Sequence, residues 1–348
     1  MITLVSTTIG DGTGYIPWTK VLNPEEDHIV IVGDRKTPHA RVQNAIREHW
    51  DGMFDYMHPD FRTDFRTEES VGYDCIQRRN VGFLRAMQLK NDYILTVDDD
   101  NFPVSSAWRD TALMVLDGKR NSPTISTANG WWNPGSLCHP PVVHRGYPLD
   151  RRHEETLPPM AQTIHNQAIG VFASLWTGDP DIDAVERIVN NPIVQQINGS
   201  RIAGLGTWAP FNSQATMFKK KYVPTMLMLP DIGRYDDIWA SYITRVLMDR
   251  DGEAVFYGYP IVNQERNEHD LLKDLDAEVF GMKHTPKFVQ TLREIAGQLP
   301  GIKGTRDEEI SFIWDSIVDE WERDLPWTTI DAIQDWQADL EALRVSAA

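Results

Sequence analysis

The chain has 348 residues, of which 41% are hydrophobic and 24% are charged, a composition typical of a globular protein with one large or two smaller domains. Its formal net charge of −17, from 34 Lys and Arg against 51 Asp and Glu, argues against a nucleic-acid-binding surface and against attraction to anionic membranes. A negatively charged substrate must therefore be held by local basic residues or by a metal ion.

The cysteines and the N-terminal residues give no indication of export. Cys75 and Cys138 form no CxxC pair, and so low a cysteine content is typical of a reducing compartment. The first residues lack the basic start and apolar stretch of a signal peptide, and no run of about 18 apolar residues predicts a membrane-spanning helix. We therefore expect a cytoplasmic protein without membrane insertion.

The first hundred residues alternate between strand-like and helix-like patterns. Apolar runs predict strands over residues 2–6, 29–32 and 93–97. Apolar residues at i, i+7, i+8 and i+11 from Ile76 predict a helix over 76–89. This order of elements is typical of an α/β fold with a mostly parallel sheet flanked by helices.

The strand predicted over 93–97 ends in three consecutive carboxylates, Asp98, Asp99 and Asp100. Adjacent anions repel one another, and a hard divalent cation shared with substrate phosphates is the usual reason to gather them. In α/β sheets, ligands bind at the carboxyl ends of strands. We therefore predict a Mn²⁺ or Mg²⁺ site of a nucleotide-sugar enzyme, the alternative being a solvated acidic turn.

Two residues near this strand are candidates for nucleotide binding. Asp34 follows the strand over 29–32, where it would either accept hydrogen bonds from a base or ribose or cap the next helix. Arg79 lies one helix before the acidic triplet. Its planar guanidinium would reach a pyrophosphate, or it would pair with a surface acid.

Residues 121–159 are rich in Pro, Gly, Trp and Arg and show little periodicity. So long an irregular segment inside a compact enzyme is usually functional. Its stretch HRGYPLDRR (144–152) concentrates positive charge in an acidic protein and would neutralise a metal-bound diphosphate. Alternatively, these arginines are solvated and paired with Glu154 and Glu155.

Further along the chain, acidic residues appear in two more clusters. The alternating acids over 179–183 resemble part of a calcium loop only weakly, because the loop glycine and terminal glutamate are misplaced. Asp236 and Asp237 follow Arg234 and would cap a helix, orient sugar hydroxyls or act as a base. Trp176 either stacks on a sugar face or belongs to the core.

The last residues predict a helical hairpin. Apolar residues keep helical spacing over 310–321 and 333–343, and Pro326 separates the two patterns. We predict a catalytic domain over 1–300 and a hairpin over 301–348. The hairpin would pack on the core or on another subunit, and we expect a homo-oligomer.

Four strings in this order resemble the reversibly glycosylated polypeptide family, also known as UDP-arabinopyranose mutases. A triple Asp alone is only moderately specific, whereas all four strings in this order are highly specific. The correspondence covers roughly Ile29 to Gly281, which is most of the chain. The strings are RRNVGFLRAMQLKNDYILTVDDDNFP (78–103), RGYPLDRR (145–152), SLWTGDPDIDA (174–184) and IGRYDDIWASYI (232–243).

This resemblance implies a GT-A-type fold, a Mn²⁺ or Mg²⁺ ion at the acidic triplet, and UDP-sugar and UDP as ligands. The self-glycosylated arginine of the family falls on Arg145. The implied reaction interconverts the pyranose and furanose forms of UDP-arabinose or a related UDP-sugar. Our candidates for nucleotide-sugar binding are Asp34, Arg79, Asp98, Arg152, Trp176 and Arg234, and those for catalysis are Arg145, Asp236 and Asp237.

Two features leave the mechanism and the sugar open. A protonated guanidinium is a poor nucleophile, so Arg145 either loses a proton to a carboxylate such as Asp236 or Asp237, or stabilises the departing diphosphate. The stretch IVNQERNEHDLL (261–272) departs from the basic, His-containing stretch of plant members. The runner-up is a metal-dependent glycosyltransferase with a separate acceptor, favoured by the Trp-rich loop around Trp131.

Overall fold

The computed structural model describes residues 1–153, 162–267, 269–301 and 304–347. Within them, ten strands form one sheet in the order β3-β2-β1-β4-β11-β8-β6-β10-β12-β5, and β7 and β9 form a separate pair. The strands are β1 (Ile2–Thr8), β2 (His28–Gly33), β3 (Met53–Met57), β4 (Tyr93–Val97), β5 (Asn101–Pro103), β6 (Lys119–Ile125), β7 (Cys138–His139), β8 (Gln162–Gly178), β9 (Gln196–Ile197), β10 (Arg201–Ala203), β11 (Ala215–Lys219) and β12 (Glu253–Gln264).

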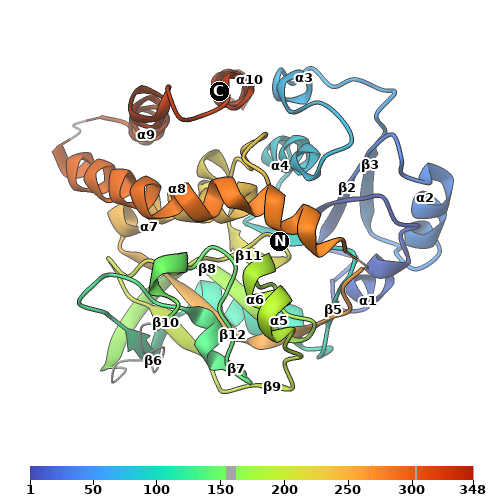
Figure 1. Cartoon of the computed structure of the whole chain (residues 1–348). Helices are drawn as coiled ribbons and strands as arrows, with labels where there is room; N and C mark the ends of the chain where they lie inside the picture. The colour runs from blue at the N-terminus through green and yellow to red at the C-terminus, as the bar shows by residue number, and fades with distance from the viewer. Residues whose placement is uncertain (154–161, 268, 302–303, 348) are drawn as a thin grey trace.

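Helices flank this sheet, and the C-terminal ones lie together on one side of the molecule (Figure 1). They are α1 (Ile16–Thr19), α2 (His39–Arg47), α3 (Thr67–Val71), α4 (Arg79–Gln88), α5 (Trp108–Asp117), α6 (Ala184–Asn190), α7 (Asp236–Asp251), α8 (Leu271–Gln298), α9 (Arg306–Trp321) and α10 (Trp327–Ala347).

The N-terminal part of the sheet is parallel, as the sequence predicts. β1 pairs in parallel with β2 and with β4, and β1 and β2 are buried along their whole length, which is typical of interior parallel strands. α4 packs closely on these strands because Gly82 has no side chain: a Cβ there would lie 2.6 Å from Val5 Cγ1 and 2.9 Å from Val32 Cγ2. The missing side chain thus sets how closely α4 approaches the sheet.

The rest of the sheet is mixed. β11 runs antiparallel to β4, with Ala215 opposite Val97, and β12 runs parallel to β8 and antiparallel to β5, with Gln264 opposite Asn101. The predicted α/β fold with C-terminal helices is confirmed. The prediction of an irregular segment over 121–159 is wrong at its start, because β6 continues to Ile125.

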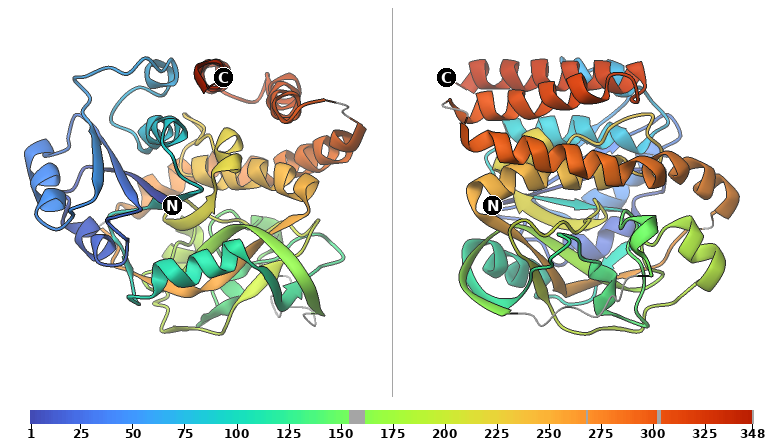
Figure 2. Two further views of the ribbon diagram at one scale, coloured as in Figure 1. Left: turned by 180° about the vertical axis from the view of Figure 1, so that it is seen from behind. Right: turned by 60° about the vertical axis from the view of Figure 1, so that its left-hand side comes forward.

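The C-terminal hairpin packs on the core of its own chain. Trp314 and Trp336 are fully buried, and both indole Nε1 atoms donate to the Pro224 carbonyl oxygen, at 3.0 and 2.9 Å. On α10, the Asp339 carboxylate accepts from the backbone N–H of Thr67, at 2.8 Å. Figure 2 shows α8, α9 and α10 lying side by side. The tryptophan stripe is therefore core.

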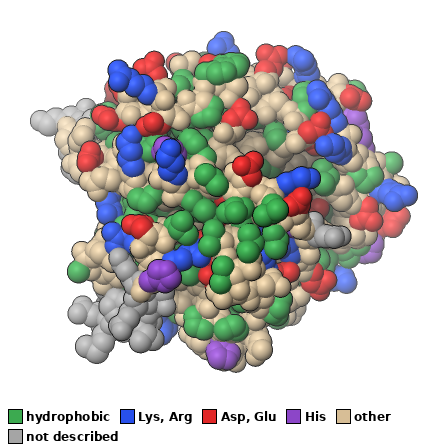
Figure 3. Space-filling view, in the orientation of Figure 1, with side chains coloured by type: hydrophobic (Ala, Val, Ile, Leu, Met, Phe, Trp, Pro, Cys, Tyr) green, Lys and Arg blue, Asp and Glu red, His purple; other side chains and the backbone are tan. Residues whose placement is uncertain are grey.

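The surface carries charges of both signs. On the face seen in Figure 3, basic side chains are interspersed with acidic ones. Cys75 and Cys138 are both free. Among the described residues, no helix is long and apolar enough to cross a membrane.

Candidate functional site

Two cavities meet at the acidic triplet. We call the one of about 310 Å³ the first cavity and the one of about 450 Å³ the second cavity. Both are lined by Ile76, Asp98, Asp100 and His269. The first cavity is also lined by Thr7, Thr8, Ile9, Asp34, Asp74, Cys75, Asp99 and Asn267. The second cavity is also lined by Gln77, Arg145, Ser213, Gln214, Met228, Asp231, Gly233, Arg234, Asp236, Asp237, Gln264, Arg266 and Ala277.

The three aspartates follow β4 and point to different partners. Asp98 Oδ1 accepts from Arg79 Nη2 at 2.5 Å. Asp99 Oδ2 accepts from Thr8 Oγ1, so its carboxylate faces the first cavity. Asp100 Oδ1 accepts from the side chain of Asn101 at 2.7 Å. Asp98 and Asp100 are therefore the pair placed at the junction of the cavities.

A close backbone approach fixes this acidic turn. A Cβ on Gly14 would lie 1.9 Å from the carbonyl oxygen of Asp99. Residue 14 must therefore be glycine for the loop after β1 to press against the turn. The loop thereby closes one side of the first cavity.

The residues at the junction fit a hard cation that also binds substrate phosphates. Among the described residues, no group of three or more His, Cys, Asp or Glu side chains is arranged as a complete metal site. Burial and the neighbouring carboxylates raise the pKa of Asp100 to about 7, a cost that a cation would relieve. Gln264 Oε1, beside the second cavity, is buried and has no hydrogen-bond partner in the described part of the chain. Two carboxylates completed by phosphate oxygens are a usual Mg²⁺ arrangement.

Of the two predicted nucleotide-binding residues near β4, one lines a cavity and the other does not. Asp34 lines the first cavity and accepts from the backbone N–H of Arg35 and Cys75, at 2.7 and 3.0 Å. It does not cap α2, which begins after Pro38. Arg79 is fully buried and lies behind Asp98, outside both cavity linings. Its guanidinium holds the Asp98 carboxylate, and its predicted contact with a pyrophosphate stays a prediction.

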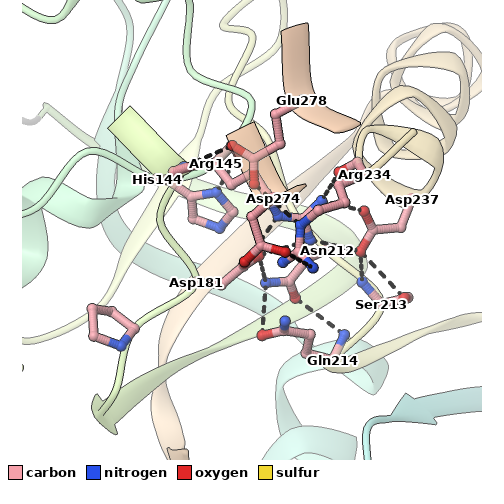
Figure 4. Close-up of polar contacts among 12 residues, drawn as sticks. His144, Arg145, Asp181, Asn212, Ser213, Gln214, Arg234, Asp237, Asp274 and Glu278 are labelled. Atoms are coloured by element: carbon pink, nitrogen blue, oxygen red, sulfur yellow. Dashed lines mark hydrogen bonds and ion pairs between the residues drawn. The ribbon is translucent and has the colours of Figure 1, made fainter. Parts of the chain in front are cut away.

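Arg145 is enclosed by carboxylates (Figure 4). Its Nε and Nη2 donate to Asp181, at 2.9 and 3.0 Å. Its Nη1 and Nη2 donate to Asp237, at 3.0 and 3.3 Å, and Nη1 also donates to the Arg234 carbonyl oxygen. A guanidinium has five N–H donors. All five of Arg145 are therefore engaged within the protein.

This enclosure decides the charge state of Arg145. Burial lowers the pKa of its guanidinium, but Asp181 and Asp237 more than compensate and hold that pKa well above its ordinary value. Burial raises the pKa of Asp181, yet Arg145 brings it below its usual range. The ion pair stays charged. Attack by Arg145 on a sugar therefore requires both a proton transfer and a rearrangement of these contacts.

The two aspartates at the start of α7 have different surroundings. Asp237 accepts from Arg145 and from the backbone N–H of Ser213, at 3.0 Å. Asp236 accepts from the Gln77 amide, at 2.8 Å. Burial, and next the charge of Asp237, raise the pKa of Asp236 to about 7. A buried carboxyl that titrates near neutrality beside a cavity is suited to proton transfer.

Two other predicted residues lie outside both linings. Arg152 pairs with Asp183 and, at 3.5 Å, with Glu186, both on or next to α6. Trp176 is 1% exposed and lies against His144, with ring centroids 5.4 Å apart. Glu154 and Glu155, the alternative partners predicted for the arginines of segment 144–152, lie outside the described residues.

Trp131, in the Trp-rich loop, is buried in the core, whereas Arg234 lines the second cavity. Trp131 is buried against Tyr242, with ring centroids 5.9 Å apart, so its ring belongs to the core. Arg234 lines the second cavity and pairs with Asp274 and Glu278, each at 3.2 Å. Its position agrees with a role in sugar binding, which stays a prediction.

Three polar residues at the end of β12 were not among our predictions for the site. Gln264, Arg266 and His269 all line the second cavity, and Glu265 N donates to the Asp100 carbonyl oxygen, at 3.0 Å. The sequence carries a usable signal: a long apolar strand ends there in a polar, partly basic stretch, as β4 ends in the acidic triplet.

Comparison with known proteins gives distant relationships. No family model matches the chain. UDP-arabinopyranose mutase 3 of Arabidopsis thaliana is 25% identical over 221 residues, which are 59% of this chain and 57% of that protein. The chain thus matches little more than half the length of this curated relative.

Solved structures of similar shape have low sequence identity. S. aureus TarS, residues 1–349, matches with a TM-score of 0.42 and 10% identity over 99% of this chain and 91% of that one. Glucosyl-3-phosphoglycerate synthase of Mycobacterium tuberculosis, in complex with Mn²⁺ and UDP-glucose, matches with a TM-score of 0.45 and 10% identity over 82% and 78%. The mannosyltransferase PcManGT of Pyrobaculum calidifontis, in complex with GDP-mannose and Mn²⁺, matches with a TM-score of 0.42 and 12% identity over 99% of this chain and 86% of that one.

Proposed function

We propose that the protein is a metal-dependent UDP-sugar mutase that interconverts the pyranose and furanose forms of UDP-arabinose or a related sugar. The observation that carries the proposal is the pair of cavities joined at Asp98 and Asp100. A nucleoside would occupy the first cavity and the sugar the second, with the diphosphate between them. The four sequence strings and the 25% identity to an arabinopyranose mutase support this choice of reaction.

The residues at the junction would hold the ion and the diphosphate. Asp98 and Asp100 would bind Mn²⁺ or Mg²⁺, with Arg79 fixing the Asp98 carboxylate from behind. When bound, the ion supplies charge that stabilises UDP as it leaves. Asp34, in the wall of the first cavity, would contact the nucleoside.

The second cavity would hold the sugar while its ring reopens. Gln77, Ser213 and Gln214 line it and offer donors and acceptors for sugar hydroxyls. If Arg145 is the attachment point, a nitrogen of its guanidinium bonds to the anomeric carbon and the bond to the UDP oxygen breaks. Asp237 or Asp181 takes the proton that the nitrogen releases. This assignment of Arg145 stays a prediction, since its ion pairs must open first.

A glycosyltransferase with a separate acceptor is the second candidate, and Asp236 favours it. Its carboxyl lines the second cavity, accepts from the Gln77 amide and has a pKa raised to about 7. Such a group would remove the proton of an acceptor hydroxyl. A mutase needs no acceptor, so the two functions predict different products.

Product analysis tests the proposal. The full chain is incubated with Mn²⁺ and radiolabelled UDP-pentoses and UDP-hexoses, and the nucleotide sugars are separated by chromatography. A mutase converts one ring form into the other without acceptor, and label that it transfers to the protein is released by added UDP. Slow hydrolysis that becomes transfer when an acceptor is supplied would support the second candidate. If no UDP-sugar is consumed, both functions are contradicted.

A further inference from the structure

Arg266 differs from the other arginines that line the second cavity. Its side chain is 8% exposed, yet its one hydrogen bond within the described residues is Nη2 to Asp274, at 3.4 Å. Its Nε is buried without a hydrogen-bond partner. A buried guanidinium with so few contacts is costly. Its donors are available to a ligand.

The carboxylate beside Arg266 is already shared. Asp274 pairs with Arg234 at 3.2 Å and with His269 Nδ1 at 3.1 Å, in addition to Arg266. Burial lowers the pKa of Arg266, the charge of Asp181 raises it, and the charges of Arg234 and Arg187 lower it, so that the pKa lies below its ordinary value. Asp274 is thus the ion-pair partner of three basic groups at once, and its contact with Arg266 is the longest of the three. The local potential favours an anion.

The backbone brings this guanidinium beside the acidic triplet. Gln264 pairs with Asn101 across β12 and β5, and Glu265 N donates to the Asp100 carbonyl oxygen. Arg266 therefore lies on the sugar side of the junction where a metal-bound diphosphate would sit.

We propose that Arg266 binds the second phosphate of a nucleoside diphosphate, opposite the cation held by Asp98 and Asp100. This inference rests on the proposed function and adds to it the residue that neutralises the leaving group. Arg145 lacks free donors for that purpose. The planar fork of Arg266 would donate to two phosphate oxygens and exchange its long contact with Asp274 for them.

Binding of uridine, UMP and UDP to the full chain tests the proposal by calorimetry at fixed Mn²⁺. Arg266→Ala should weaken UDP binding about 10- to 100-fold, as expected for loss of charge-assisted hydrogen bonds. Binding of UMP and uridine should change by less than about threefold, because neither carries the second phosphate. Arg266→Lys should fall between, since it keeps the charge and loses the fork.

Arg306→Ala is the matched control. Arg306 lies on α9 and forms ion pairs with Asp251 and Glu309 outside both linings, so UDP binding should equal that of the wild type. If Arg266→Ala binds UDP like the wild type, or loses UDP, UMP and uridine equally, the inference is overturned while the proposed function stands. A wild-type chain that binds no uridine nucleotide overturns both.

Discussion

Arg145 and Arg266 both line the second cavity, and the two segments that carry them differ in how many of the arginine's N–H donors are already used. In the segment 144–152, Arg145 donates all five N–H groups to the protein. In the segment after β12, Arg266 makes a single long hydrogen bond among the residues that the structure describes. The first segment has the higher density of charge in the sequence, but the second has the available guanidinium. Availability of donors, more than charge density, indicates where an anion binds.

The largest effect should come from the carboxylates at the junction of the two cavities. Asp100→Ala is expected to reduce consumption of UDP-sugar at least about 100-fold, because loss of a ligand removes several kcal/mol of charge stabilisation by the ion. The fold should be retained, since burial and Asp98 make the charge of Asp100 unfavourable. Activity with Mn²⁺ and the thermal unfolding midpoint are measured together.

The control for this prediction is Asp60→Ala, which removes an exposed carboxylate remote from the linings and should leave activity unchanged. Excess chelator should reduce wild-type activity as Asp100→Ala does. An unchanged wild-type rate in chelator would exclude the metal.

The second prediction compares how much the protein is destabilised when the arginine of each segment is replaced by alanine. Arg145→Ala should lower the free energy of unfolding by about 3–5 kcal/mol, because it leaves Asp181 and Asp237 buried without their cation. Arg266→Ala should lower it by less than about 1 kcal/mol, since Asp274 keeps Arg234 and His269. Urea denaturation of the two variants measures both values. Equal losses would contradict the contrast between the segments.

The smallest effect concerns pH. If Asp236 is a general base, activity should fall about tenfold per pH unit below a pKa of about 7, because the protonated carboxyl cannot accept a proton. Asp236→Asn should lose this limb of the profile of kcat/KM while keeping nucleotide affinity. A profile that is the same in wild type and variant would remove Asp236 from proton transfer.

The pH dependence of the free energy of unfolding is a second, independent measure of the pKa of Asp236. The pKa of Asp236 is raised above its unfolded value of 3.8, so the folded state retains a proton that the unfolded state loses between those values. The contribution of Asp236 to the free energy of unfolding therefore falls as pH rises from about 4 to about 7. The asparagine variant should lack this contribution, and urea denaturation at pH 5 and pH 8 measures it.

The part of the site that follows directly from one strand, the acidic turn after β4, could be predicted from the sequence. The apolar run of β4 ends in Asp98 and Asp100, and strand ends in α/β sheets meet ligands, so their place at a cavity junction follows. Trp176 and Arg79 could not be placed in this way. Trp176 lies within β8 and Arg79 is the first residue of α4. Both have side chains suited to ligand binding, but packing places Trp176 against His144 and Arg79 behind Asp98.

The sequence by itself determined the α/β fold, the acidic turn after β4 and the C-terminal hairpin, because apolar periodicity and proline act over a few neighbouring residues. Only the tertiary structure decided which charges neutralise one another. Asp181, Arg145 and Asp237 come from separate segments, and β12 brings Arg266 to the acidic turn through its pairing with β5. Ion pairing depends on distance in space and on burial, which local sequence patterns do not contain.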